Sequence, residues 1–87
     1  MRETVIATLT KVSNKEYKNT GNLIEIYDVI INFDTYIKEN VSKELYDKLK
    51  LETDTVDKEY MFGDGDEYSE YVYNDCVEAL KDVIAAL

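Results

Sequence analysis

The sequence predicts a small α+β domain, in which a short helix and a long C-terminal helix pack on one face of a small antiparallel β-sheet. Three observations lead to this fold class. Residues with high β-propensity dominate the N-terminal segments 3–12 and 23–33. A polar stretch that carries Asn and Gly separates these segments. Apolar residues recur at helical spacing over 67–87. At 87 residues, we expect a single domain that spans 1–87.

The two N-terminal segments are expected to form a β-hairpin. In the first, Val5, Ala7 and Leu9 alternate with polar and β-branched residues, which is typical of a strand. In the second, the apolar phase shifts near Asp28, which indicates a bulge or a local twist. Residues 13–22 are expected to form the long hairpin loop that joins the two strands.

The middle of the chain gives weaker patterns. Asp34 or Asn40 is a candidate start for a short helix, and apolar spacing predicts a helix over 41–51 with Ser42 as its N-cap. Residues 56–62 are expected to add a third strand to the sheet.

The C-terminal helix has the clearest pattern, and it follows a turn expected at 63–66. One face of this helix is apolar and collects Val72, Tyr73, Cys76, Val77, Leu80, Val83, Ile84 and Leu87. The opposite face is polar and collects Tyr71, Asn74, Asp75, Glu78, Lys81 and Asp82. We therefore expect Cys76 to be a small buried hydrophobic residue rather than a reactive thiol.

The composition argues against several chemistries. The chain has no histidine and one cysteine, so Ser-His or Cys-His catalysis, a Cys/His zinc site and an intramolecular disulfide are excluded. No glycine-rich phosphate loop is present. The acidic segment that starts at Asp64 lacks the glycine and the bidentate glutamate of an EF-hand loop. We expect no enzyme activity, no catalytic residue, no cofactor and no metal.

The N-terminus shows no signal peptide, and no apolar run is long enough for a membrane span, so a cytoplasmic location is expected. The net charge of −9 is unevenly placed. Residues 1–50 hold eight basic and eight acidic side chains, whereas 51–87 hold two basic and eleven acidic ones. The negative electrostatic field of 51–87 repels nucleic acid and anionic membranes and attracts basic protein surfaces. Acidity can also serve solubility alone.

The acidic and aromatic residues of the C-terminal third are the candidate functional residues. Asp75, Glu78 and Asp82 fall at i, i+3 and i+7, so they form a row of negative charges along one helix face that resembles a run of backbone phosphates. Tyrosines interleave with the acids, and aromatic residues are enriched at interface hot spots. The predicted partner-binding residues are Asp64, Asp66, Glu67, Glu70, Tyr71, Asp75, Glu78 and Asp82.

This acidic, tyrosine-containing stretch, 52–82, resembles the small acidic inhibitors that phages and mobile elements encode, including anti-CRISPR and other DNA-mimic proteins. The resemblance is to a class without a common motif, and it covers roughly a third of the chain. It implies a stoichiometric inhibitor that acts in the host cytoplasm on the basic nucleic-acid-binding surface of a defence nuclease complex such as a CRISPR effector. The alternative is a small structural or adaptor subunit that self-associates, as a dimer for example, through an exposed sheet edge and the apolar tail 84–87.

Overall fold

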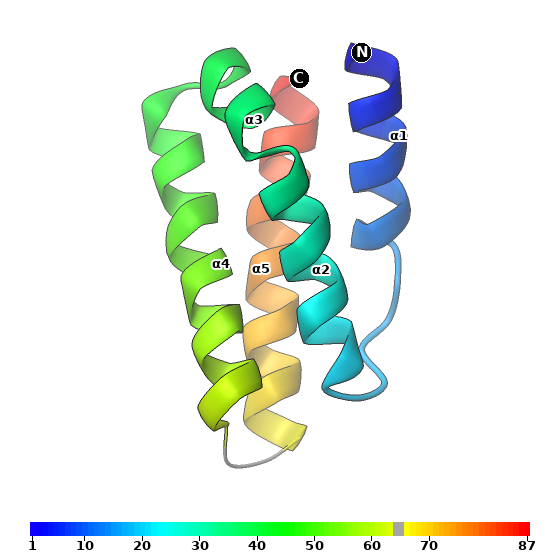
Figure 1. Cartoon of the computed structure of the whole chain (residues 1–87), viewed down its shortest axis with the longest axis vertical. Coiled ribbons are helices and arrows are strands. Elements are labelled where there is room, and N and C mark those ends of the chain that lie inside the picture. The colour runs from blue at the N-terminus through cyan, green and yellow to red at the C-terminus, as the bar shows by residue number, and fades with distance from the viewer. Residues whose placement is uncertain (64–65) are drawn as a thin grey trace.

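The computed structural model describes residues 1–63 and 66–87, and it shows a bundle of helices (Figure 1). In chain order the helices are α1 (Arg2–Ser13), α2 (Gly21–Asn32), α3 (Asp34–Asn40), α4 (Lys43–Phe62) and α5 (Asp66–Ala86). No strand occurs in these two described ranges, so the predicted α+β class, with its sheet and β-hairpin, is wrong.

The four longer helices run up and down the bundle, and the short α3 lies at one end (Figure 1). The α1–α2 connection, the C-terminal end of α4 and the N-terminal end of α5 lie at the opposite end, whereas both chain termini lie at the α3 end (Figure 1). Helix α5 is the central element, because it contacts α1, α2 and, most extensively, α4. At the terminal end, the Arg2 Nε donates a hydrogen bond of 2.6 Å to the carbonyl oxygen of Leu87.

The predicted strand 3–12 is helix α1. Its buried residues Val5, Leu9 and Val12 fall at i, i+4 and i+7, which is helical spacing. Val5, Ala7 and Leu9 also fall at every second position, so the sequence fits the period of a strand as well as that of a helix. A β-branched residue costs at most about 0.7 kcal/mol of helix propensity relative to Ala. Burial of one Val or Leu contributes about 1.5–3 kcal/mol, so packing decides in favour of the helix.

The predicted strand 23–33 is helix α2, which buries Leu23, Ile26 and Ile30 along one face. The continuous apolar run in this segment is compatible with either element, because both a buried strand and a buried helix require it. Residues 14–20 do form a connection, but they join two helices rather than two strands.

Helix α3 starts at Asp34, one of the two predicted starts. Ser42 is the N-cap of α4, as predicted, and its hydroxyl oxygen accepts a hydrogen bond of 3.2 Å from the backbone N–H of Leu45. The helix then continues to Phe62, so the predicted third strand at 56–62 is wrong. No glycine or proline interrupts the chain between Lys43 and Phe62, and the buried side chains keep helical spacing throughout.

Helix α5 confirms the clearest sequence pattern. Val72, Tyr73, Cys76, Leu80 and Val83 are all buried in the core. Val77, Ile84 and Leu87 are partly buried and pack against the same core. No helix in the described part of the chain is long and apolar enough to cross a membrane.

The hydroxyl of Tyr73 ties this helix to the α1–α2 connection. It donates a hydrogen bond of 2.6 Å to the carbonyl oxygen of Lys15, and the rings of Tyr73 and Tyr17 lie 5.6 Å apart. Burial raises the pKa of the Tyr73 hydroxyl above its ordinary value. A single side chain therefore joins residues that are 58 positions apart in the sequence.

Candidate functional site

The outward face of α5 carries most of the predicted partner-binding residues. Glu67, Glu70, Tyr71, Glu78 and Asp82 are exposed on it. They share this face because a helix advances roughly 100° per residue, which brings positions four, eleven and fifteen residues after Glu67 back to about the same side. Helix α5 holds six acidic residues and one basic residue, so this surface is strongly negative. We call these five residues, with Asp75 at their edge, the acidic face.

The other predicted residues are placed differently. Asp75 is half-buried at the edge of the acidic face. Asp66 begins α5, but its side chain is not among those that the structure describes, and Asp64 lies outside the described residues. Asp82 is within 3.9 Å of Lys48 Nζ on α4. Both side chains are 58% exposed, so this ion pair is screened by water and leaves the acidic face largely unneutralised.

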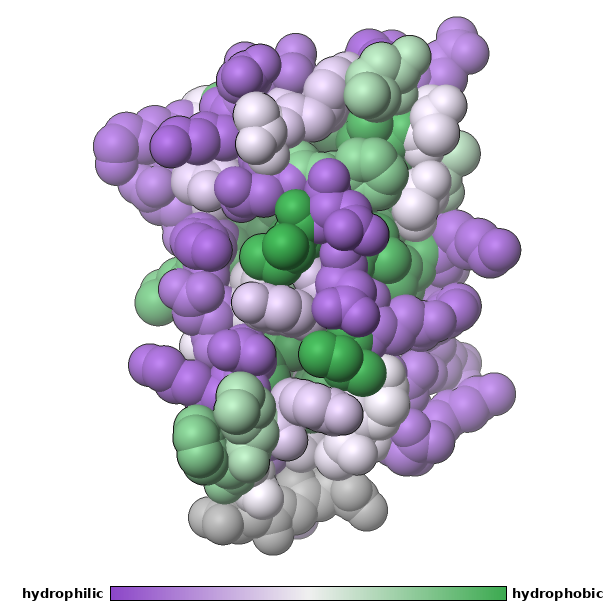
Figure 2. Space-filling model, viewed as in Figure 1, coloured by the Kyte–Doolittle hydropathy of each residue, from purple (hydrophilic) through white to green (hydrophobic). Residues whose placement is uncertain are grey.

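A second surface adjoins the acidic face at the end of the bundle where α4 passes into α5. Three exposed side chains come from the last turn of α4, namely Tyr60, Met61 and Phe62, and two come from α5, namely Tyr68 and Tyr71. Phe62 is 76% exposed and Met61 is 63% exposed. Figure 2 shows hydrophobic atoms over this end of α4. We call these five residues the aromatic end.

That α4 contributes to the aromatic end was not predicted from the sequence. Residues 56–62 were expected to form a strand, where alternate residues face a core. A continuous helix from Lys43 turns Met61 and Phe62 away from the face that carries Leu49, Thr53 and Val56. The signal that predicts this placement is the absence of a helix breaker before Gly63.

Two tyrosines of the aromatic end form a pair on α5. The rings of Tyr68 and Tyr71 are stacked, with centroids 6.3 Å apart and planes inclined by 14°. Their spacing of three residues places them on neighbouring turns of the helix. Together with Glu67, they line a shallow hollow on the surface. Because each tyrosine is more than half exposed, ring surface remains open to a ligand.

A buried polar contact holds the two helices together beneath the aromatic end. Glu59 of α4 is 8% exposed, and its Oε2 accepts a hydrogen bond of 2.7 Å from the Ser69 hydroxyl of α5. The backbone N–H of Gly63 donates to the carbonyl oxygen of Glu59 at 2.8 Å. A Cβ at position 63 would collide with the carbonyl oxygen and the carboxylate of Glu59, so this close approach requires glycine.

Cys76 is buried at the centre of the bundle, as the sequence predicts. Burial raises the pKa of its thiol to about 12, and a hydrogen bond with Thr53 offsets this only in part. The side chain is therefore a neutral thiol at physiological pH and a poor nucleophile. In the part of the chain that the structure describes, no three His, Cys, Asp or Glu side chains are grouped closely enough to hold a metal ion.

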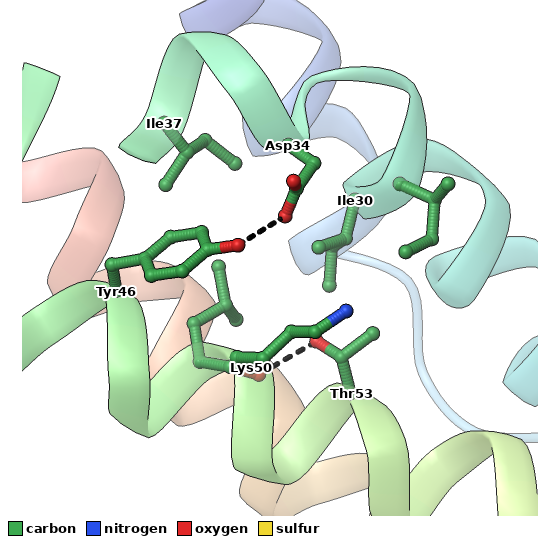
Figure 3. Close-up of a pocket in the computed structure, with 8 residues that line it drawn as sticks. Ile30, Asp34, Ile37, Tyr46, Lys50 and Thr53 are labelled. Atoms are coloured by element: carbon green, nitrogen blue, oxygen red, sulfur yellow. Dashed lines mark hydrogen bonds between the residues drawn. The ribbon is translucent and has the colours of Figure 1, made fainter. Parts of the chain in front are cut away.

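A small cavity lies between α2, α3 and α4, and its lining is drawn in Figure 3. Its volume is about 10 Å³, which is the room of a single water molecule. Beside it, the Tyr46 hydroxyl donates a hydrogen bond of 2.9 Å to Asp34, and this bond raises the pKa of Tyr46 (Figure 3). The Thr53 hydroxyl donates to the carbonyl oxygen of Leu49 at 2.6 Å. The cavity is a packing gap and not a ligand site.

No protein-family model, curated protein or solved structure matches this chain. The acidic face and the aromatic end are therefore interpreted from their own chemistry. Both consist of exposed side chains on helices that pack against a common core. This arrangement suits recognition of another macromolecule, because interfaces use exposed aromatic and charged groups in a fixed geometry.

Proposed function

We propose that this chain is a non-enzymatic, protein-binding inhibitor. Its acidic face docks on a basic, nucleic-acid-binding surface of a partner and excludes nucleic acid from that surface. A defence nuclease complex such as a CRISPR effector is the class of partner implied by the resemblance to DNA-mimic inhibitors. The chain itself is not expected to bind DNA or RNA, because its net charge of −9 repels both.

The observation that carries the proposal is the line of carboxylates on α5. The acidic face places five of them between Glu67 and Asp82, a distance of roughly 22 Å along the helix. The mean spacing is about 5–6 Å per negative charge, compared with one phosphate about every 3.4 Å along a DNA strand. A basic groove that binds a nucleic-acid strand therefore finds a comparable charge density on α5.

The test uses three charge reversals on the acidic face, Glu70→Lys, Glu78→Lys and Asp82→Lys. All three side chains are exposed, so the fold should tolerate the changes. The immobilised chain is used to capture proteins from host lysate, and duplex DNA is then added to compete for the captured protein. We expect DNA to release the partner, the triple variant to capture none of it, and the association rate to fall as salt is raised.

A matched control reverses three exposed acids elsewhere, Glu16→Lys, Asp28→Lys and Glu39→Lys. Both variants change the net charge by the same amount, so they differ only in where the change lies. The control should still capture the partner. Equal loss of capture by both variants, or a partner that DNA does not release, would show that the acidic face has no specific role.

A self-associating structural or adaptor subunit is the second candidate. The adjacent, exposed Met61 and Phe62 support it, because exposed apolar patches mark interaction surfaces. The structure changes which surface would mediate this self-association. The described residues contain no sheet edge, and in the apolar tail Ile84 and Leu87 pack against the core. If this candidate is correct, sedimentation will show an oligomer that Met61→Ser with Phe62→Ser dissociates and the triple charge reversal does not.

A further inference from the structure

The stacked pair Tyr68–Tyr71 has a chemistry that the acidic face alone does not. Two nearly parallel rings and the Glu67 carboxylate line one surface hollow in the first two turns of α5. Tyr68 is 58% exposed and Tyr71 is 63% exposed, although such rings are usually buried or paired with a partner. A ring face beside a carboxylate attracts a cation, through the ring quadrupole and through the negative charge.

The charged side chains described on α5 before Lys81 are all acidic, namely Glu67, Glu70, Asp75 and Glu78. Glu67 itself lines the hollow. The helix dipoles add little, because the C-terminal end of α4 lies beside the N-terminal end of α5 and their fields oppose each other (Figure 1). The ligand that this end of the bundle favours is therefore cationic.

The shape of the site favours a guanidinium over an ammonium group. A guanidinium is planar and can lie flat on an aromatic ring while its N–H groups form paired hydrogen bonds to a carboxylate. An ammonium group is compact and strongly hydrated, so it gains less from a ring face. Met61 and Phe62 are exposed at the same end of the bundle, where they suit apolar side chains that flank such an arginine.

A second copy of this chain is a poor source for the arginine. The chain has one arginine, Arg2, and it already donates to the carbonyl oxygen of Leu87 at the opposite end of the bundle (Figure 1). A symmetric contact between two aromatic ends would also bring two acidic surfaces together, and like charges disfavour such an interface. The source of the arginine that fits this site is therefore a different, basic protein.

We infer that Glu67, Tyr68 and Tyr71 form a binding site for an arginine side chain of the partner protein, flanked by apolar contacts on Met61 and Phe62. This inference rests on the proposed function, since it identifies the group by which a basic partner is held. It predicts that the partner presents an arginine together with apolar residues. Tyr71 belongs to both surfaces and joins the arginine site to the acidic face.

The site can be tested without the partner. The probe is a capped Gly-Arg-Gly peptide, and a capped Gly-Lys-Gly peptide provides the comparison. Each is titrated into the isotope-labelled full chain, and backbone amide shifts are followed by NMR. We expect saturable shifts centred on residues 67–71, with a Kd in the millimolar range, and binding of the lysine peptide weaker by about threefold or more.

Two conservative variants locate the site. Glu67→Gln removes the carboxylate from the hollow, whereas Glu78→Gln removes an equal charge further along the same face. We expect Glu67→Gln to raise the Kd by about threefold to tenfold and Glu78→Gln to leave it within about twofold. Tyr68→Leu with Tyr71→Leu should abolish the shifts. Because both rings are exposed, the thermal midpoint should stay close to that of the native chain.

Several results would overturn the site. These are equal affinity for the two peptides, shifts spread along all of α5, equal effects of the two glutamine variants, or shifts that depend on protein concentration and indicate self-association instead. Failure here differs from failure of the proposed function, because the peptide titration involves neither the partner nor nucleic acid. A partner that the triple charge reversal releases, combined with a silent titration, would leave the acidic face in place and remove the arginine site.

Discussion

The Ser69 hydroxyl donates a hydrogen bond of 2.7 Å to the carboxylate of Glu59, and both residues are buried. This contact joins the last turns of α4 to the first turns of α5 directly beneath the aromatic end. A carboxylate is costly to remove from water unless its oxygens find donors. The Ser69 hydroxyl therefore stabilises the region on which the proposed arginine site depends.

Replacement of Ser69 by Ala should lower the free energy of unfolding by about 1–3 kcal/mol, because it leaves a buried acceptor without this donor. Urea unfolding followed by circular dichroism measures the change. Glu59→Gln is the control, since its amide oxygen can still accept the hydrogen bond. If Ser69→Ala costs less than about 0.5 kcal/mol, the contact does not stabilise the α4–α5 junction.

Leu80 is fully buried on the inner face of α5. Leu80→Ala should cost about 2–5 kcal/mol, through lost burial and the cavity that remains. This is a large part of the stability of so small a domain. Glu78→Ala, two positions earlier and exposed, should change the free energy of unfolding by no more than about 0.5 kcal/mol. Similar urea midpoints for the two variants would mean that α5 does not pack as described.

The hydroxyl of Tyr73 can be removed alone. Tyr73→Phe keeps the ring against Tyr17 but loses the hydrogen bond to the Lys15 carbonyl oxygen. We expect a loss of about 0.5–1.5 kcal/mol in the free energy of unfolding. Tyr71→Phe makes the same chemical change on an exposed ring and should have no measurable effect. Equal effects of the two variants would contradict the role of the α1–α2 connection as an anchor for α5.

The buried thiol of Cys76 should make the free energy of unfolding depend on pH in a specific way. Burial raises the pKa of its thiol to about 12 from an ordinary value of 9.0. Since the folded pKa is the higher one, this group's contribution to stability is complete below the unfolded pKa and is lost as the pH rises through the folded pKa. Between pH 8 and about pH 10.5, the native chain should lose about 1–2 kcal/mol of stability more than Cys76→Ala.

Tyrosine ionisation occurs in both the native chain and Cys76→Ala, so it cancels in that comparison. Thiol modification provides a second readout. At pH 8 the folded chain should react far more slowly with a thiol reagent than the chain in urea, because the thiolate population is small and buried. Fast modification of the folded chain would show that Cys76 is accessible.

The amphipathic pattern of α5 could be predicted from the sequence because its period is unambiguous over more than five turns. Ser42 as an N-cap, and Asp34 as a helix start, could be predicted because capping is local chemistry. Neither periodicity nor capping could assign the segments 3–12 and 23–33 to helices. Their β-branched residues suit a strand, and only the neighbouring helices supply the packing that makes α1 and α2 more stable.

The acidic face followed from the sequence, because outward positions of a predicted helix can be counted along the chain. The aromatic end did not, since it depends on α4 continuing to Phe62 and on the packing of α4 against α5, which places Tyr60–Phe62 at the same end as Tyr68 and Tyr71. The Glu59–Ser69 contact is equally invisible in the sequence, because nothing local indicates that a glutamate will be buried.

By itself, then, the sequence determined which residue types this protein lacks, histidine above all, the location of its negative charge and the face that its last helix turns outward. These properties depend on residue identity and on local periodicity. The tertiary structure decided the fold class, the burial of Glu59 and the meeting of two sets of exposed aromatic residues at one end of the bundle. The physical reason is that a few tenths of a kcal/mol in local propensity are outweighed by the kilocalories gained when whole side chains are buried between helices.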